Sequence, residues 1–321
     1  MILCCGETLI DFIPTAARDG SPAYRPANGG SIHNVAIALG RLDVPVGFVG
    51  SISTDFFGDA LADGLHSNGV DLKHVNRLDR PTTLAFVNLE AAEPRYLFYD
   101  AEVADRHWRI EDMPPVGPAM RALHFGSISL IRWPAAEAYA ELMRREVSRR
   151  VISFDPNIRP GLVRDETDYR ARLDAFFRRA HVIKVSDADL EWIAPGRDRA
   201  DLAADWLAAE ARLVLITRGG EGAVAFSRSA TISRRAAPIV VADTVGAGDS
   251  FMAGCLAALH DRQRLDVAAI ESLSPSELAE ILEFALAVAA VTCSRVGADP
   301  PRRGDLPPAP VFGRSAAVAE G

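Results

Sequence analysis

The chain has 321 residues, of which 49% are hydrophobic and 24% charged, and it carries a formal net charge of −8. This composition is typical of a globular protein with a large core, and the negative charge argues against a general nucleic-acid binder. The N-terminus has no basic segment ahead of a long apolar core, and no run of about 18 apolar residues occurs elsewhere. We therefore expect no signal peptide, no membrane span and no nucleic-acid partner.

The cysteines give no sign of a disulfide framework or a metal site. None of them has the Cys-x-x-Cys spacing of a metal or redox motif, and all lie in apolar stretches; they are Cys4, Cys5, Cys255 and Cys293. Reduced, buried thiols are the simplest interpretation, and they predict a cytoplasmic protein.

Apolar strand-like segments alternate with helical segments along most of the chain. Strands are predicted at residues 2–5, 8–13, 46–50, 122–125, 151–154, 181–185, 213–216, 223–226, 231–233 and 239–241. Helices are predicted at residues 35–42, 56–68, 135–150, 169–179, 202–209, 251–259 and 277–293. This alternation predicts right-handed βαβ units in a three-layer α/β/α fold with a mainly parallel central sheet.

A hairpin interrupts this alternation. Residues 82–89 and 95–99 read as two short strands joined by the polar turn 90–94. We expect the hairpin and the strand pieces near the N-terminus to form a second, smaller β element.

A glycine-rich turn lies between predicted strand 239–241 and predicted helix 251–259, in the segment DTVGAGDSF at residues 243–251. The N-terminus of a helix offers free N–H groups and a partial positive charge, which suit a phosphate. Asp249 stands where this helix begins, so its carboxylate could accept a proton from a substrate hydroxyl. The alternative is an ordinary glycine-rich loop with Asp249 as the helix N-cap, and this short string alone does not decide between the two.

Other turns could also bind ligands. Gly29, Gly30 and Asn34 stand at the start of predicted helix 35–42 as a hydrogen-bonding cradle for hydroxyls, although a capped helix explains them too. Asp11 lies in an apolar strand, either on an exposed face or placed to bind something. Arg159 follows predicted strand 151–154, at the end where open α/β sheets bind ligands, or it is a solvated loop charge.

Several kinds of active site are absent from the sequence. No Gly-x-x-x-x-Gly-Lys-Ser/Thr string occurs, no Gly-x-Gly-x-x-Gly follows the first strand, and there is no Gly-x-Ser-x-Gly or His-Glu-x-x-His. What remains is a set of glycine-rich turns at strand ends and one well-placed aspartate. These are the parts needed for phosphoryl transfer to a hydroxyl.

Taken together, these segments resemble the ribokinase/PfkB family of carbohydrate kinases, from the first strand to about residue 301. The segment at 243–251 is similar to the family's C-terminal signature, and Gly29-Gly30-x-x-x-Asn34 resembles its N-terminal signature. The opening residues 1–11 and residues 184–191 look most like bacterial fructokinases.

The resemblance implies a role for each of these turns. It makes Asp249 the catalytic base, with Gly246, Ala247 and Gly248 as the anion hole for the transferred phosphoryl group. It assigns sugar binding to Asp11, Gly29, Gly30, Asn34, Phe98 and Arg159. It assigns the nucleotide to Lys184, Ser186, Thr217, Gly219, Gly222, Gly246, Gly248, Ala290 and Cys293.

The implied activity is ATP-dependent transfer of the γ-phosphoryl group to the terminal hydroxyl of a neutral sugar, with D-fructose first. Another substrate of the family (2-keto-3-deoxygluconate, ribose or a nucleoside) and a non-catalytic sugar- or nucleotide-binding regulator are the alternatives. The implied cofactors are ATP and Mg²⁺, with a K⁺ site in relatives bordering Val245 and the residues after Cys293.

The resemblance also implies one kinase domain over residues 1–301, with a β-sheet lid from about 8–28 and 82–100 that joins two copies in a homodimer. The proline-rich residues 302–321 are expected to form a partly disordered tail.

Some positions depart from the family pattern. The direct Mg²⁺ ligands stay open, because Asp189 stands where relatives often carry a glutamate and would act through water. Asp100 replaces a frequent arginine, which we interpret as disfavouring an acidic sugar. His33 is larger than the usual residue before Asn34.

Overall fold

The computed structural model describes residues 1–88, 95–112 and 115–306. The turn predicted at residues 90–94 and the tail from residue 307 onward lie outside the described residues. Within those ranges, no helix is long and apolar enough to cross a membrane.

The centre of the molecule is a sheet in which the described residues form nine strands, in the order β13-β12-β11-β10-β9-β8-β1-β4-β5. All neighbouring pairs are parallel except those that β12 makes with β11 and β13. The strands are β1 (Ile2–Cys5), β4 (Val46–Ser53), β5 (Val70–Leu78), β8 (Ala122–Gly126), β9 (Val151–Asp155), β10 (Val182–Ser186), β11 (Leu213–Thr217), β12 (Ala223–Phe226) and β13 (Thr231–Arg234).

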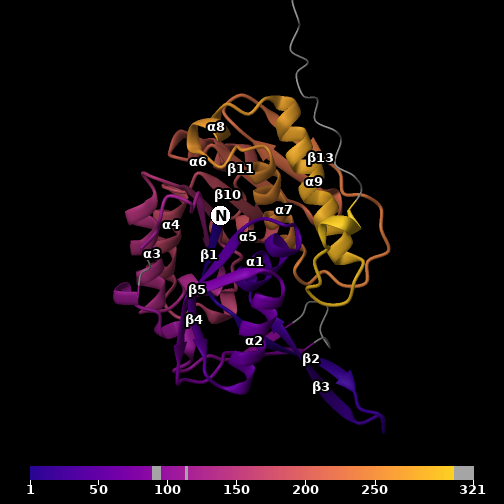
Figure 1. Ribbon diagram of the computed structural model, residues 1–321. Coiled ribbons are helices and arrows are strands. Elements are labelled where there is room, and N and C mark those ends of the chain that lie inside the picture. Colours follow the sequence, from indigo (N-terminus) through magenta and orange to yellow (C-terminus); the bar gives the residue numbers. More distant parts are fainter. Residues whose placement is uncertain (89–94, 113–114, 307–321) are drawn as a thin grey trace, which may run out of the picture.

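Helices cover both faces of this sheet, so the predicted three-layer fold is confirmed (Figure 1). One face packs against α1 (Ser31–Arg41), α2 (Phe56–Ser67), α7 (Ala247–Asp261), α8 (Val267–Glu271) and α9 (Pro275–Cys293). The other packs against α3 (Ala135–Glu146), α4 (Glu166–Phe177), α5 (Asp187–Ile193) and α6 (Arg199–Ala208). Short 3₁₀ turns complete the described chain at η1 (Ala104–His107), η2 (Ile110–Asp112), η3 (Ser127–Leu130), η4 (Pro160–Leu162), η5 (Gly219–Glu221) and η6 (Arg303–Asp305).

The strand residues divide between two cores because side chains alternate along a strand. In β1, Ile2 and Cys4 belong to the core under α1 and α7, whereas Leu3 and Cys5 belong to the core under α3 and α4. All four side chains are fully buried, as expected for a central parallel strand with both faces covered.

A second, smaller sheet stands beside this body. Its order is β3-β2-β6-β7, with bounds Pro22–Gly29, Leu9–Ala16, Leu84–Asn88 and Arg95–Tyr99 respectively. Strands β2 and β3, and likewise β6 and β7, are antiparallel, whereas β2 and β6 run parallel. Figure 1 shows β2 and β3 extending away from the body as a ribbon. The predicted small β element is thus present.

Two strands and two helices escaped prediction. Strand β3 contains Pro22 and Pro26 and is largely exposed, so its sequence reads as a loop; the strand forms because an edge position tolerates proline. Strand β5 was missed because its sequence is polar. It lies at an edge of the central sheet, where polar side chains are tolerated. The missed helices, α5 and α8, are only 7 and 5 residues long.

One predicted strand is wrong. Ile239, Val240 and Val241 form no strand, and the Val240 side chain is 90% exposed. The chain pairs instead at its next residues, where the N–H groups of Ala242 and Asp243 donate to the carbonyl of Cys293 at the end of α9. This pairing ties the loop to α9 rather than to the sheet.

Close packing of α7 on α9 fixes the helix whose first turn carries Asp249. A Cβ built at Gly254 would lie 2.9 Å from Ala285 Cα and 3.1 Å from Val288 Cγ2. The glycine therefore permits a backbone approach that no larger residue allows.

We expect Gly254→Ala to lower the free energy of unfolding by about 1–3 kcal/mol, because the added methyl group must push α7 and α9 apart. Thermal denaturation measures this as a drop of several degrees in Tm. Gly304→Ala is the matched control, since nothing lies within 4 Å of a Cβ at that exposed glycine. Equal Tm values for the two variants would contradict this account of the helix contact.

Candidate active site

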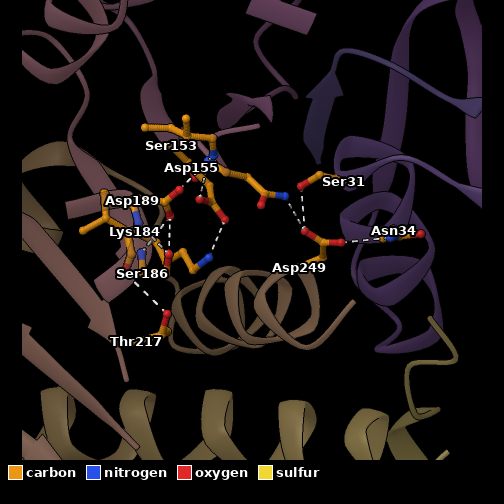
Figure 2. A network of polar contacts seen from close by, with 12 residues as sticks. Ser31, Asn34, Ser153, Asp155, Lys184, Ser186, Asp189, Thr217 and Asp249 are labelled. Atoms are coloured by element: carbon orange, nitrogen blue, oxygen red, sulfur yellow. Dashed lines mark hydrogen bonds and ion pairs between the residues drawn. The ribbon is translucent and has the colours of Figure 1, made fainter. Parts of the chain in front are cut away.

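The centre of the site is the Asp249 carboxylate, in the first turn of α7 and 6% exposed. Ser31 Oγ donates to its Oδ1 at 2.6 Å, and Asn34 Nδ2 donates to its Oδ2 at 2.8 Å (Figure 2). A longer contact of 3.5 Å joins Asn157 Nδ2 to Oδ1. The carboxylate is therefore held by side chains from α1 and from the loop after β9.

The turn before Asp249 has the geometry of an anion-binding helix start. Gly246 is the N-cap of α7 and has a φ of 75°, a left-handed conformation that favours glycine. A Cβ there would also lie 2.7 Å from the Cβ of Ala298. The first N–H groups of an α-helix have no partner within the helix, which suits an anionic ligand; here the N–H of Ala247 donates to the carbonyl of Thr244 at 3.2 Å.

A buried ion pair lies under this turn. Lys184 Nζ donates to Asp155 Oδ2 at 2.8 Å, and a Cβ on Gly248 would lie 2.9 Å from the same nitrogen. Burial lowers the pKa of Lys184, but Asp155 and the neighbouring acids outweigh it and raise the pKa above its ordinary value. Burial raises the pKa of Asp155 to about 6 against the effect of Lys184. Near pH 7 the two groups thus form an ion pair whose ammonium end lies against the turn at Gly248.

Asp189 is already used by the protein. Its Oδ1 accepts from the N–H of Ile158 at 2.8 Å, while Oδ2 accepts from the N–H and hydroxyl of Ser186 at 2.9 and 2.6 Å. These bonds form a capping box at the start of α5 and connect β10 to the loop after β9. Both Ser186 and Asp189 are therefore structural here, whatever else they contact.

Asp11 belongs to the small sheet and faces this centre. Burial raises its pKa to about 7, with Asp249 adding to the shift and Arg159 opposing it. Its carboxylate lies against Gly29, because a Cβ at that glycine would be 2.1 Å from Asp11 Oδ2. The adjacent Gly30 has a φ of 100° and starts α1. The two glycines thus let β3 and α1 meet directly beside the carboxylate.

Arg159 is turned back on its own loop. Its Nη1 donates to Asn157 Oδ1 at 2.7 Å and to two backbone carbonyls of that loop. Asn157 has a φ of 37°, and its N–H donates to Asp155 at 3.2 Å. The loop thereby brings Arg159 close enough to Asp11 to affect its pKa.

Five of the predicted nucleotide residues lie at or just after the end of β11 and on the last turns of α9. Thr217 Oγ1 donates to the carbonyl of Val185 at 3.4 Å, and Gly219 is exposed with nothing near its Cβ position. Gly222 is different, because a Cβ there would lie 2.0 Å from the carbonyl oxygen of Arg234. Close packing on the β13 chain accounts for this glycine. Ala290 and Cys293 are partly exposed on the last turns of α9.

Comparison with known proteins gives one consistent result. Residues 1–303 match the pfkB family carbohydrate kinase description. The chain belongs to this family. It is 42% identical over 278 residues to a fructokinase from Rhizobium leguminosarum bv. trifolii, covering 87% of this chain and 85% of that protein. It is 34% identical over 310 residues to probable fructokinase-3 of Arabidopsis thaliana, covering 94% and 88%.

A solved structure with the same fold is fructokinase with bound ATP from Xylella fastidiosa. It superimposes with a TM-score of 0.85 at 31% sequence identity, covering 95% of this chain and 94% of that chain. The ribokinase-like fold predicted for this PfkB carbohydrate kinase is therefore confirmed, as is its membership of a sugar kinase family.

Sequence reasoning missed three polar side chains of this PfkB kinase site. Ser31 and Asn157 contact Asp249, yet they lie far from it in the chain and carry no signature of their own. Tyr96 lies on the small sheet beside Asp11; burial raises its pKa, and the charges of Asp11, Arg159 and Asp249 also affect it. Tyr96 lies two residues before the predicted Phe98 in β7, and side chains two residues apart in a strand lie on the same face. This alternation could have identified Tyr96.

The interpretation of Asp100 needs correction. The side chain is buried and forms ion pairs at 3.0 Å with both Arg106 and Arg132. Its charge is compensated inside the protein, so it gives no reason to exclude an acidic sugar.

His33 has a structural place as well. Its Nδ1 shares a hydrogen bond of 2.8 Å with Thr8 Oγ1, and burial lowers its pKa to about 4, which keeps it neutral. The large side chain therefore fills the core behind α1.

Among the described residues, no group of three or more His, Cys, Asp or Glu side chains could hold a metal ion. The acids near the site are engaged, with Asp155 on Lys184 and Asp189 in its capping box. These side chains therefore suit a metal ion that is held mainly by ligands from outside the protein. They do not suit a metal ion that the protein coordinates alone.

Proposed function

We propose that this chain is an ATP-dependent fructokinase that transfers the γ-phosphoryl group to the terminal hydroxyl of D-fructose. The observation that carries the proposal is the position of Asp249, a buried carboxylate at the start of a helix, with Asn34 and Asp11 on one side and the anion-binding turn on the other. The 42% identity to a bacterial fructokinase supports the choice of sugar.

In the proposed reaction, Asp249 accepts the proton of the sugar hydroxyl while that oxygen bonds to the γ-phosphorus and the bond to the β-phosphate oxygen breaks. The amides of Gly246, Ala247 and Gly248 stabilise the charge on the phosphoryl oxygens. The ammonium group of Lys184 also stabilises this charge, since it lies against Gly248.

The sugar is proposed to lie between the small sheet and α1, with Asp11, Asn34 and the Gly29–Gly30 backbone binding its hydroxyls. Phe98 and Tyr96 face it from β7, with ring centroids 6.0 Å apart. Arg159 would leave its internal bonds to reach between sugar and phosphates. The small sheet then serves as a lid that excludes water.

ATP is proposed to lie along the ends of β10 and β11, with Ser186, Thr217, Gly219 and Gly222 near its phosphates and ribose. Ala290 and Cys293 would border the adenine. The exposed side chains of the loop before α7 favour an apolar rim for this pocket, since Ile239, Val240 and Val241 are 38%, 90% and 58% exposed.

We propose Mg²⁺ as the metal, brought in on the ATP phosphates and reached by Asp189 only through water. A K⁺ site is proposed beside Asp243, whose carboxylate accepts from the N–H groups of Val245 and Gly297 at 3.0 and 2.8 Å. We also propose a cytoplasmic location, which the use of ATP and the free cysteines support.

We propose further that two copies pair through the outer face of the lid. On the side away from Asp11, the lid presents stacked and edge-on aromatic contacts among Phe12, Phe86, Tyr24 and Tyr99. Leu97 and Tyr99 are 58% and 59% exposed there. An apolar surface of this kind in a soluble chain is typical of a protein–protein contact, and the lid's strand edges favour a second copy.

The central prediction concerns the base. Asp249→Asn removes the proton acceptor but keeps the shape, so kcat with fructose and MgATP should fall by about 10²–10⁴ with little change in ATP affinity. A coupled ADP-release assay measures kcat, and titration calorimetry measures binding. Asp198→Asn is the control, because Asp198 is an exposed carboxylate that caps α6 and accepts from the N–H groups of Ala200 and Asp201. Full activity in Asp249→Asn would refute the assignment.

The same assay with fructose, ribose, 2-keto-3-deoxygluconate and adenosine tests the substrate. Fructose is expected to give the highest kcat/KM. A preference for another compound would redirect the proposal within the family, and ADP release with none of them would favour a binding protein.

The second prediction is a pH effect at Asp11. Because its pKa rises from 3.8 to about 7 on folding, the folded state binds the extra proton, and stability falls as pH rises between these values. Asp11→Asn should therefore raise Tm more at pH 8 than at pH 4.

In wild type, kcat/KM for the sugar should fall as pH drops below about 7, because a protonated carboxyl accepts fewer hydrogen bonds. An Asp11→Asn variant that retains the wild-type acid limb in kcat/KM would contradict this.

The third prediction tests the dimer. Leu97→Glu places a charge in the outer lid face, so light scattering after size exclusion should show a dimer for wild type and a monomer for the variant. Ile110→Glu is the matched change, at a leucine-sized side chain that is 43% exposed on η2 beside α3. A monomeric wild type would overturn the proposed pairing.

A further inference from the structure

We infer that Ser31 is a positioning residue for the reaction: its hydroxyl orients the Asp249 carboxylate and favours its charged form before the sugar binds. The inference rests on the proposed role of Asp249 as the base. The starting observation is that Ser31 makes the shortest of the three contacts to this carboxylate, at 2.6 Å against 2.8 and 3.5 Å. Ser31 and Asp249 are 7% and 6% exposed, so little water competes for the bond.

The Ser31 hydroxyl is not needed to cap its own helix. Gly30 is the N-cap of α1, and this helix has no side-chain cap of the usual kind. A carboxylate from another segment does this work instead: Glu7 Oε1 accepts from the N–H of Ile32 at 3.3 Å. The hydroxyl of Ser31 thus remains free for Asp249.

Glu7 is itself fixed. It is 1% exposed, its Oε2 accepts from the hydroxyl of Ser129, and its own N–H donates to the same Ser129 oxygen at 3.1 Å. The first turn of α1 is therefore anchored from behind by η3. From this turn Ser31 and Asn34 extend toward the two oxygens of Asp249 (Figure 2).

The charges around Asp249 explain why such a donor matters. Asp11 on β2 and Asp155 on β9 face it and disfavour a further negative charge, while Lys184 on β10 favours it. The guanidinium of Arg159, in the loop after β9, and the hydroxyl of Tyr96 on β7 lie near the same acids. A hydrogen bond to the ionised form of a carboxyl stabilises that form. Ser31 therefore opposes the two acids.

The bond leaves room for the substrate. A carboxylate offers about four acceptor sites, and the three donors seen here leave at least one for the sugar hydroxyl. The same geometry directs the remaining lone pair, because the carboxylate plane cannot rotate while α1 holds both oxygens. Loss of Ser31 would free one oxygen and alter the proton affinity of the base.

The test is the pH dependence of kcat in Ser31→Ala, measured by ADP release with saturating sugar and MgATP. Saturation matters, because kcat then reports groups in the ternary complex, whereas Asp11 acts on sugar binding. We expect the acid limb of log kcat to move about 0.5–1 pH unit higher, and the plateau to fall about 10-fold, since a hydrogen bond to a charged group is lost.

Ser51→Ala is the matched control. Ser51 is a buried serine of β4 whose hydroxyl has no hydrogen-bond partner among the described residues, so its removal should leave both the limb and the plateau unchanged. An acid limb in Ser31→Ala that coincides with that of wild type overturns the inference, because a purely structural serine would alter the plateau or Tm without moving the limb.

Failure of the inference differs from failure of the proposed function. If wild type releases ADP with a sugar and Asp249→Asn does not, the base is established, and the Ser31→Ala limb alone decides the role of the serine. If wild type releases no ADP with any compound of the panel, the proposed function fails, and this inference fails with it.

Discussion

The arrangement of the site depends on the hydrogen bonds that hold one buried carboxylate, that of Asp249. Asp249 lies where α7 begins, and the helix start, the Lys184 cation and three side-chain donors supply the stabilisation that water would otherwise give. No single segment could provide all of these. Ser31 is 218 residues away from Asp249 in the chain, at the start of α1. Asn157 follows β9, and in the central sheet β9 is separated from β1 by β8. The doubly wound topology matters because it brings these strand ends and helix starts to one edge.

Glycines set the distances in this arrangement, and they do so in two ways. At Gly246 the backbone conformation itself requires glycine, whereas at Gly29, Gly248 and Gly254 the requirement is the absence of a Cβ. The first kind shapes the anion-binding turn. The second kind lets a carboxylate, an ammonium group and a neighbouring helix come close to the backbone. Glycines inside and outside the two signature segments therefore mark close contacts as well as a turn.

Sequence reasoning succeeded where the determinants are local. The loop at residues 243–251 carries its own turn, helix start and acid, and the alternation of strands and helices predicted the layers. It failed where a partner from a distant segment decides the outcome. Asp100 looked unfavourable to an acidic sugar because it replaces a frequent arginine, whereas its partners Arg106 and Arg132 compensate its charge inside the protein. Ile239 to Val241 looked like a strand because β-branched residues favour strands, although in the described part of the chain no strand pairs with them. The roles assigned to the predicted site residues stay predictions, although the fold brings Asp11, Asn34, Arg159, Lys184 and Asp249 into one neighbourhood.

The small sheet has two faces with different proposed roles, and neighbouring residues of β2 contribute to opposite faces. Asp11 points toward the proposed sugar site, and the adjacent Phe12 stacks on Phe86 on the opposite face, with ring centroids 4.6 Å apart. Side chains alternate strictly along a strand, so the insertion or deletion of one residue in β2 would exchange the acid and the ring. Point substitutions can therefore adapt either face independently during evolution, whereas changes in the length of β2 affect both at once. We expect homologous chains to differ in the composition of this strand far more readily than in its length.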